Sequence, residues 1–187
     1  IYTLSLHDAL PILESIIEIE QQEIVEIERM MREYGDSLLR MCIIYLKDRV
    51  LAEDAVQETF IKVYQKYYTF NRISEEKTWI MRIAINVCKN YMRTSWFKRV
   101  KTGLDLETIS KERIDQNFIE RERQKQILSE IAELERKYKE VILLYYYQEM
   151  STKEIASILH IKEGTVRVRL QRARQKLSVQ LEEGEKL

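Results

Sequence analysis

Apolar residues along this chain recur at the spacing of α-helices. Near the C-terminus, Val166, Leu170, Ala173 and Leu177 fall at i, i+4, i+7 and i+11, which is one stripe of a helix. Glu, Lys, Ile, Leu, Arg and Gln are abundant, whereas Pro occurs once and Gly four times. Helix formers therefore dominate and helix breakers are scarce. We expect an all-α protein.

The helical pattern divides into two parts. A Glu-rich amphipathic helix is expected over 13–33, Gly35 is expected to interrupt it, and further helices extend to residue 97. A polar stretch begins at Gly103 and has little apolar periodicity. We therefore expect two small helical domains joined by a flexible linker. The N-terminal domain would span 13–99, the linker 100–118 and the C-terminal domain 119–187.

The first twelve residues differ from the rest of the chain. They contain the only Pro, and no helical period leads out of them. We expect residues 1–12 to be a non-native or disordered leader.

The C-terminal segment has the pattern of a helix-turn-helix. Ser151 and Glu154 have the spacing of a capping box, which opens a helix. The apolar face of that short helix comprises Ile155, Ala156, Ile158 and Leu159. Residues 160–164 make the turn, and the stripe that starts at Val166 marks the second helix.

The outward face of this second helix suits a DNA groove. At 100° per residue, Val168, Gln171, Arg172 and Gln175 lie opposite the apolar stripe. Arg167 and Arg174 flank that face, and Arg169 borders the buried side. Gln and Arg side chains can form hydrogen bonds with base edges, and Arg side chains at the edges of this face can bind phosphates. The alternative is a surface helix whose arginines are accidental. The candidate DNA contacts are Thr165, Arg167, Val168, Gln171, Arg172, Arg174 and Gln175.

Charge is sorted along a chain whose net charge is zero. The first 35 residues are strongly acidic, whereas 77–104 and 164–181 contain no Asp or Glu and several Lys and Arg. Two separate basic surfaces suggest that the protein binds a polyanion at two sites. The alternative is two solvated helix faces, although such faces normally mix both signs.

Several classes of protein are disfavoured. No stretch is apolar for the length of a membrane helix, and no export signal is recognisable, so we expect no membrane insertion. Cys42 and Cys88 lie in apolar segments and are expected to be buried, reduced thiols of a cytoplasmic protein. The chain shows no metal-ligand spacing, no phosphate-binding Gly loop and no nucleophile–base pair. We expect no enzyme activity and no cofactor.

Four motifs carry a resemblance to a known family. The N-terminal part contains D-x-x-Q-E-x-F at residues 54–60 and W-x-x-R-I-A-x-N at 79–86. The C-terminal part contains S-x-x-E-I-A-x-x-L at 151–159 and G-T-V-x-x-R-L-x-R-A-R at 164–174. Their order and spacing across 34–180 resemble sigma-70-family RNA polymerase sigma factors of the extracytoplasmic-function type. One departure is Lys162, which stands where the family often has Ser or Pro to open the recognition helix, so we expect a weaker cap.

The resemblance implies three binding surfaces. The C-terminal helix would read the minus-thirty-five promoter element. Asp54, Gln57 and Glu58 share one helix face and would bind the clamp helices of the largest subunit of core RNA polymerase; taken alone, the trio would be an ordinary solvated face. The minus-ten element would be read by residues of the second motif and the loop before it, where Phe70 and Asn71 are candidates to hold a flipped base. The minus-ten candidates are Phe70, Asn71, Arg82, Asn86, Lys89, Asn90 and Arg93.

The resemblance predicts a sigma factor, which binds core RNA polymerase, directs initiation at one class of promoter DNA and aids its melting. Its family often has an inhibitory anti-sigma factor, which is a further expected kind of partner. The alternative is a dimeric helix-turn-helix repressor or activator in which the helix at 13–33 serves dimerisation. That alternative leaves the motifs at 54–60 and 79–86 without a role.

Overall fold

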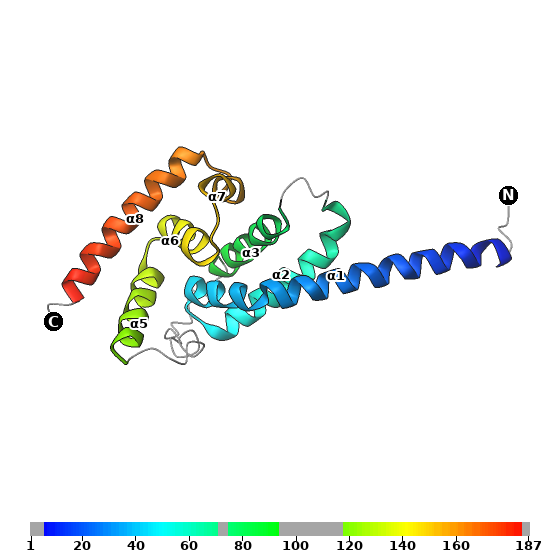
Figure 1. Cartoon of the computed structure of the whole chain (residues 1–187), viewed down its shortest axis with the longest axis horizontal. Helices are drawn as coiled ribbons and strands as arrows, with labels where there is room; N and C mark the ends of the chain where they lie inside the picture. Colours follow the sequence, from blue (N-terminus) through cyan, green and yellow to red (C-terminus); the bar gives the residue numbers. More distant parts are fainter. Residues whose placement is uncertain (1–5, 71–74, 94–117, 185–187) are drawn as a thin grey trace.

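The computed structural model describes the backbone of residues 6–70, 75–93 and 118–184, and the side chains of 21–70, 75–93 and 124–179. All regular structure in these ranges is helical, which confirms the all-α prediction (Figure 1). None of the described helices is both long enough and apolar enough to cross a membrane. The predicted linker lies outside the described residues, apart from Phe118, which begins a helix.

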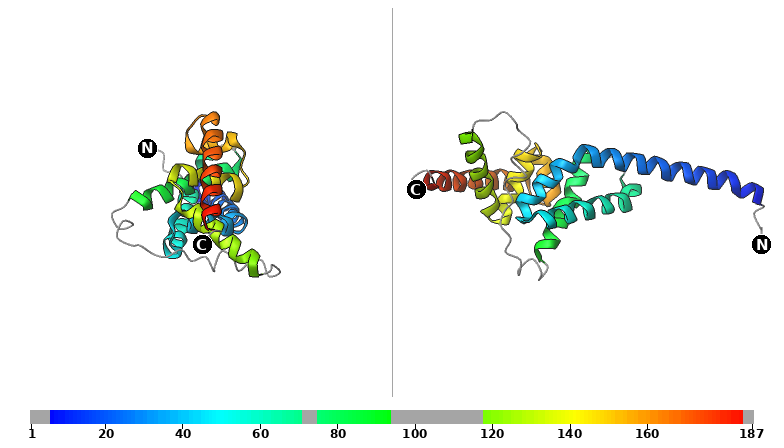
Figure 2. Two further views of the ribbon diagram at one scale, coloured as in Figure 1. Left: turned by 90° about the vertical axis from the view of Figure 1, so that its left-hand side faces the viewer. Right: turned by 90° about the horizontal axis from the view of Figure 1, so that it is seen from below.

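The first helix, α1 (Leu6–Leu46), is continuous, and its N-terminal part extends away from the other helices (Figures 1 and 2). The predicted interruption at Gly35 is therefore wrong. A single Gly costs a helix only about 0.5–1 kcal/mol relative to Ala. Met30 and Leu38, on either side of Gly35, are fully buried, and their packing outweighs that cost.

The leader expected over 1–12 was either non-native or disordered. Residues 6–12 are helical and belong to α1, and residues 1–5 lie outside the described residues. Extending a helix that packing has already nucleated costs far less than starting one. The backbone can therefore continue outward from the packed part of α1 without a tertiary contact at every turn.

The N-terminal half is completed by α2 (Arg49–Lys66), the short η1 (Tyr67–Thr69) and α3 (Glu76–Arg93). Asp48 caps α2, because its Oδ1 accepts the backbone N–H of Leu51 at 2.9 Å. The inner face of α2 is formed by Ala52, Ala55, Phe60 and Val63, which are buried.

The C-terminal half is also helical in its described residues. It comprises α5 (Phe118–Glu133), α6 (Arg136–Ile142), η2 (Leu143–Tyr147), α7 (Thr152–Leu159) and α8 (Glu163–Gly184). The segment η2 continues α6 as a π-helix, in which the backbone N–H of Gln148 bonds the carbonyl of Leu143 at 3.1 Å. The predicted helix-turn-helix is formed by α7 and α8 (Figure 1).

The two halves pack against each other, and their buried apolar residues form one continuous cluster. Tyr45 of α1 is fully buried and donates its hydroxyl to Oε1 of Glu140 in α6 at 2.8 Å. Buried Gln148 donates its amide to the carbonyl of Ser37 at 3.0 Å. Polar groups that are withdrawn from water are thus satisfied across the boundary, which makes the contact between the halves specific.

Candidate nucleic-acid interface

The helix-turn-helix is built as the sequence predicts. Ser151 accepts the backbone N–H of Glu154, and the Glu154 carboxylate accepts the backbone N–H of Ser151 at 2.8 Å, which completes the capping box. The helix ends at His160 in a left-handed conformation, with φ of 54°. Ile161 in the turn packs against the common core. The backbone N–H of Ile161 also bonds the carbonyl of Ala156 at 3.1 Å, so a hydrogen bond and an apolar contact both hold the turn between α7 and α8.

The second helix, α8, has a buried and an exposed side. Val166, Leu170 and Ala173 are buried and Leu177 packs on the core, which confirms the predicted stripe. Arg169 is half-buried at the border of that stripe, also as predicted. The seven candidate DNA contacts are exposed, namely Thr165, Arg167, Val168, Gln171, Arg172, Arg174 and Gln175.

Two arginines at the margins of α8 have partners within the protein. Arg167 donates to Oε1 of Glu163 at 2.6 Å, one turn earlier on the same helix. Hydrogen bonds from Thr152 and then from Arg167 lower the pKa of the Glu163 carboxyl. Arg174 donates its Nε–H to the hydroxyl of Tyr146, at the end of η2, at 2.8 Å. The sequence pattern predicted neither partner.

On α2, the structure places the three candidate polymerase contacts on the outside. Asp54 and Gln57 are exposed, whereas Glu58 is half-buried and forms an ion pair with Lys62, one turn later. Burial, followed by the charge of Glu58, raises the pKa of the Tyr91 hydroxyl on α3. Glu58 is therefore held by neighbours on two helices, while Asp54 and Gln57 face solvent.

The candidate minus-ten residues of α3 fall into two groups. Asn86, Asn90 and Arg93 are exposed, whereas Arg82 and Lys89 are half-buried at the boundary with the C-terminal half. The inner stripe of α3 comprises Ile83 and Val87, which are buried, and Trp79 and Tyr91, which pack on the core.

Arg82 and Lys89 both meet residues of the C-terminal half. Arg82 donates Nη2–H to the hydroxyl of Ser157 on α7 at 2.7 Å, and its Nε is buried without a described partner. The Nζ atom of Lys89 lies 3.7 Å from Oε1 of Glu140 on α6. Two side chains that were expected to contact DNA thus contact other residues of the protein in this conformation.

Ahead of α3, Phe70 is half-buried and its ring stacks on Trp79, with 4.8 Å between centroids and 26° between planes. One face of Phe70 is therefore covered by Trp79. The other flipped-base candidate, Asn71, lies outside the described residues.

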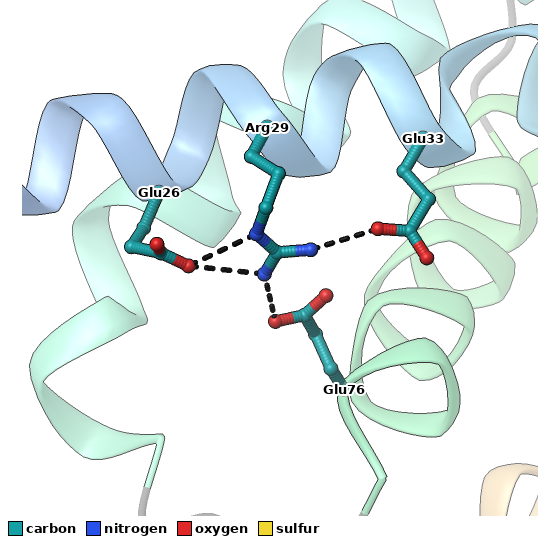
Figure 3. Close-up of polar contacts among 4 residues, drawn as sticks. All are labelled: Glu26, Arg29, Glu33 and Glu76. Atoms are coloured by element: carbon teal, nitrogen blue, oxygen red, sulfur yellow. Dashed lines mark hydrogen bonds and ion pairs between the residues drawn. The ribbon is translucent and has the colours of Figure 1, made fainter.

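The start of α3 is tied to α1 by a cluster that the sequence analysis missed (Figure 3). Arg29 bonds Glu26 at 3.1 Å and Glu33 at 2.8 Å on its own helix, and it reaches across to Glu76 at 2.6 Å. The bonds to Glu76 and then Glu26 raise the pKa of the Arg29 guanidinium. The spacing of Glu26 and Glu33 about Arg29 signals the pairs within α1, but no local pattern signals a partner 47 residues away.

The two cysteines are buried, as the sequence predicts. Cys42 and Cys88 form no disulfide bond, and their Sγ atoms lie 3.5 Å apart, within hydrogen-bonding distance. Contact with Cys42, followed by burial, raises the pKa of the Cys88 thiol. Within the described parts of the chain, no group of His, Cys, Asp and Glu side chains is arranged to hold a metal ion.

Comparison with protein families matches both halves of the chain. Residues 30–98 match the model described as "Sigma-70 region 2", and residues 124–177 match "Sigma-70, region 4". The first match covers α2, α3 and the packed part of α1. The second covers the helix-turn-helix and most of α5.

Characterised relatives are similar over most of their length. The chain is 31% identical over 152 residues to the ECF RNA polymerase sigma factor SigM of Bacillus subtilis (strain 168), covering 81% of this chain and 92% of SigM. It is 32% identical over 161 residues to SigW of the same organism, covering 79% of this chain and 84% of SigW.

Two solved structures share the fold. The sigma factor RpoE of Bartonella quintana, in complex with the anti-sigma factor NepR, has a TM-score of 0.62 at 25% identity, covering 83% of this chain and 98% of RpoE. CnrH, in complex with the cytosolic domain of CnrY, has a TM-score of 0.62 at 22% identity, covering 83% of this chain and 87% of CnrH.

Proposed function

We propose how this chain, which belongs to the extracytoplasmic-function group of RNA polymerase sigma factors, contacts polymerase and promoter DNA. Sigma factors are regulators of transcription initiation and are generally not enzymes. The observation that carries the proposal is the presence of both sigma regions, in order, in a chain that spans 92% of SigM. A dimeric helix-turn-helix regulator would account for α7 and α8 but not for the region 2 match.

Core RNA polymerase would bind the outer face of α2. The exposed carboxylate and amide of Asp54 and Gln57, with Glu58 beside them, form an acidic polar surface that fits a basic partner. The clamp helices of the largest polymerase subunit are the partner that family membership implies. Because Glu58 is already paired with Lys62, we expect Asp54 to contribute more than Glu58.

The minus-thirty-five element would be read by α8. Its exposed face presents Gln171, Arg172 and Gln175 toward base edges, with Val168 available for apolar contact to a thymine methyl group. Arg167 and Arg174 at the margins, and Thr165 at the start of the helix, would hold backbone phosphates.

The minus-ten element would be read by α3 and Phe70. Asn86, Asn90 and Arg93 are exposed and can meet DNA in this conformation. Arg82 must first break its contact with Ser157, and Lys89 its contact with Glu140, before these side chains can bind DNA. We therefore propose that α3 separates from α6 and α7 when the minus-ten element binds.

An anti-sigma factor is a further proposed partner. The RpoE structure was solved with the anti-sigma factor NepR, and its fold matches this chain over 83% of its length. We expect an inhibitor of this kind to bind the present chain and to keep it from core polymerase. Since polymerase and chromosome share the bacterial cytoplasm, the protein is expected to act there.

The test is reconstitution with core RNA polymerase. Asp54→Lys combined with Glu58→Lys should weaken core binding by about tenfold or more, because both changes put like charges against a basic partner. The matched control is Glu28→Lys with Asp36→Lys, which reverses two exposed acids of α1. Circular dichroism should show the same helix content in both double variants. Unchanged core binding by the α2 variant would contradict the proposed polymerase face.

A further inference from the structure

One arginine of α8 is held by aromatic side chains from another element. The Arg174 guanidinium lies over the rings of Tyr145 and Tyr146, with 5.7 Å from Cζ to each ring centroid. Its Nε–H also bonds the Tyr146 hydroxyl at 2.8 Å. Tyr146 is 51% exposed and Arg174 is exposed, so this contact lies at the protein surface.

Tyr146 lies within the π-helical segment η2, whose backbone turn is wider than that of an α-helix. Leu143 and Leu144 remain buried, while Tyr145 and Tyr146 meet edge to face with 5.0 Å between their centroids. The segment η2 thus contributes apolar side chains to the core and also places the Tyr146 hydroxyl next to Arg174.

The bond through Nε determines which guanidinium edge is presented. An Arg side chain has five N–H donors, and an oxyanion is best held by two parallel donors of one edge. Tyr146 takes the Nε–H of Arg174, and the aromatic rings cover part of the guanidinium surface. The edge formed by the two Nη groups takes no part in the Tyr146 bond, and it can hold a phosphate in bidentate geometry.

We propose that Tyr146 is a positioning residue that orients Arg174 toward a backbone phosphate of the minus-thirty-five DNA. This proposal rests on the proposed function, because it assumes that Arg174 faces DNA. Fixing the guanidinium before binding reduces the freedom that the long side chain loses when it meets the phosphate. Tyr146 itself need not touch DNA.

The test is a double-mutant cycle with Tyr146→Phe and Arg174→Ala, measured as the Kd of the reconstituted holoenzyme for promoter DNA at several salt concentrations. Arg174→Ala should weaken all minus-thirty-five sequences alike and reduce the salt slope by about one unit. Tyr146→Phe should weaken binding about two- to fivefold alone. It should have no further effect once Arg174 is Ala, since only Arg174 transmits its effect.

The possible outcomes distinguish the positioning role of Tyr146 from the phosphate contact of Arg174. If Arg174→Ala lowers the salt slope while Tyr146→Phe acts additively with it, Tyr146 is not a positioning residue although Arg174 does hold a phosphate. If Arg174→Ala leaves the salt dependence of promoter binding unchanged, Arg174 does not contact a phosphate, and the proposed role of Tyr146 is wrong as well. Tyr68→Phe, which alters the 81% exposed Tyr68 of η1, is the matched control and should not couple to Arg174.

A second variant keeps the test decisive if Tyr146→Phe is poorly folded, which thermal denaturation would show. Arg174→Lys keeps the charge but loses the Nε donor and the planar fork. It should retain the salt slope and still bind promoter DNA more weakly than the wild type. Wild-type affinity for Arg174→Lys would contradict the inference, because a point charge would then serve as well as an oriented guanidinium.

Discussion

The two helices proposed to bind DNA, α3 and α8, differ in which neighbours their candidate contact residues meet. The candidate contacts of α8 are all exposed, and its marginal arginines are held by neighbours within the same half. On α3, Arg82 and Lys89 instead meet Ser157 and Glu140 of the other half. In the free protein, the proposed minus-thirty-five surface on α8 is therefore fully exposed, whereas the proposed minus-ten surface on α3 is exposed only in part. Substitutions in either half, or at the boundary between them, test this difference.

The largest effect on stability is expected for a core side chain of α1. Leu38→Ala removes a fully buried side chain and should lower the free energy of unfolding by about 2–5 kcal/mol. Because the buried cluster spans both halves, denaturant unfolding should remain one transition when followed by circular dichroism. Met31→Ala, at a position that is 49% exposed, is the control and should have a small effect. Two separate transitions would show that the halves fold independently and that their contact is weak.

A smaller effect, of opposite sign, is expected in the C-terminal half. Lys139 of α6 is buried, and burial followed by the charge of Lys47 lowers its pKa from 10.5 to about 8. At pH 7 the buried amine is still protonated and destabilises the fold. Lys139→Met should therefore raise the free energy of unfolding on the order of 1–3 kcal/mol at pH 7.

The pH dependence gives the check on Lys139. Between pH 8 and 10.5 the folded wild type loses this proton while the unfolded chain keeps it, so wild-type stability gains from this group as the pH rises. The advantage of Lys139→Met should shrink across that window, in denaturant titrations at pH 7, 9 and 10.5. Lys137→Met, at an exposed neighbour, is the control. A stabilisation that stays constant with pH would contradict the stated cause.

The smallest effect concerns the boundary between the halves. Ser157→Ala removes the acceptor of Arg82 and should change the free energy of unfolding by less than about 1 kcal/mol. It should also release Arg82, so the free protein should bind a single-stranded minus-ten oligonucleotide about two- to fivefold more tightly. Fluorescence anisotropy measures this, with Ser129→Ala on α5 as the control. Unchanged affinity would mean that the Ser157 bond does not restrict Arg82.

Periodicity within a single helix was the part of the sequence that predicted structure well. It identified the buried stripe of α8, the apolar face of α7 and the capping box at Ser151 and Glu154. It failed at Gly35, because local propensity is weaker than the packing of residues on both sides.

Contacts between distant segments could not be read from the sequence. The pairs Arg29–Glu76, Arg82–Ser157 and Tyr45–Glu140 join residues 47 to 95 positions apart, and no local pattern specifies them. The contact between Tyr146 of η2 and Arg174 of α8 likewise joins distant segments. The sequence therefore predicted which residues face outward on α8 but not which of the residues on α3 are already engaged.

The central claim is that α8 and α3 read two different promoter elements in one polymerase complex. The direct measurement is initiation by reconstituted holoenzyme on a promoter library, comparing the wild type with Arg172→Ala and Asn86→Ala, which alter two exposed residues. Arg172→Ala should relax preference only within the minus-thirty-five element, at a cost of about 1–3 kcal/mol at the affected position. Asn86→Ala should relax preference only within the minus-ten element. Relaxation of the same element by both variants, or of neither, would contradict the account.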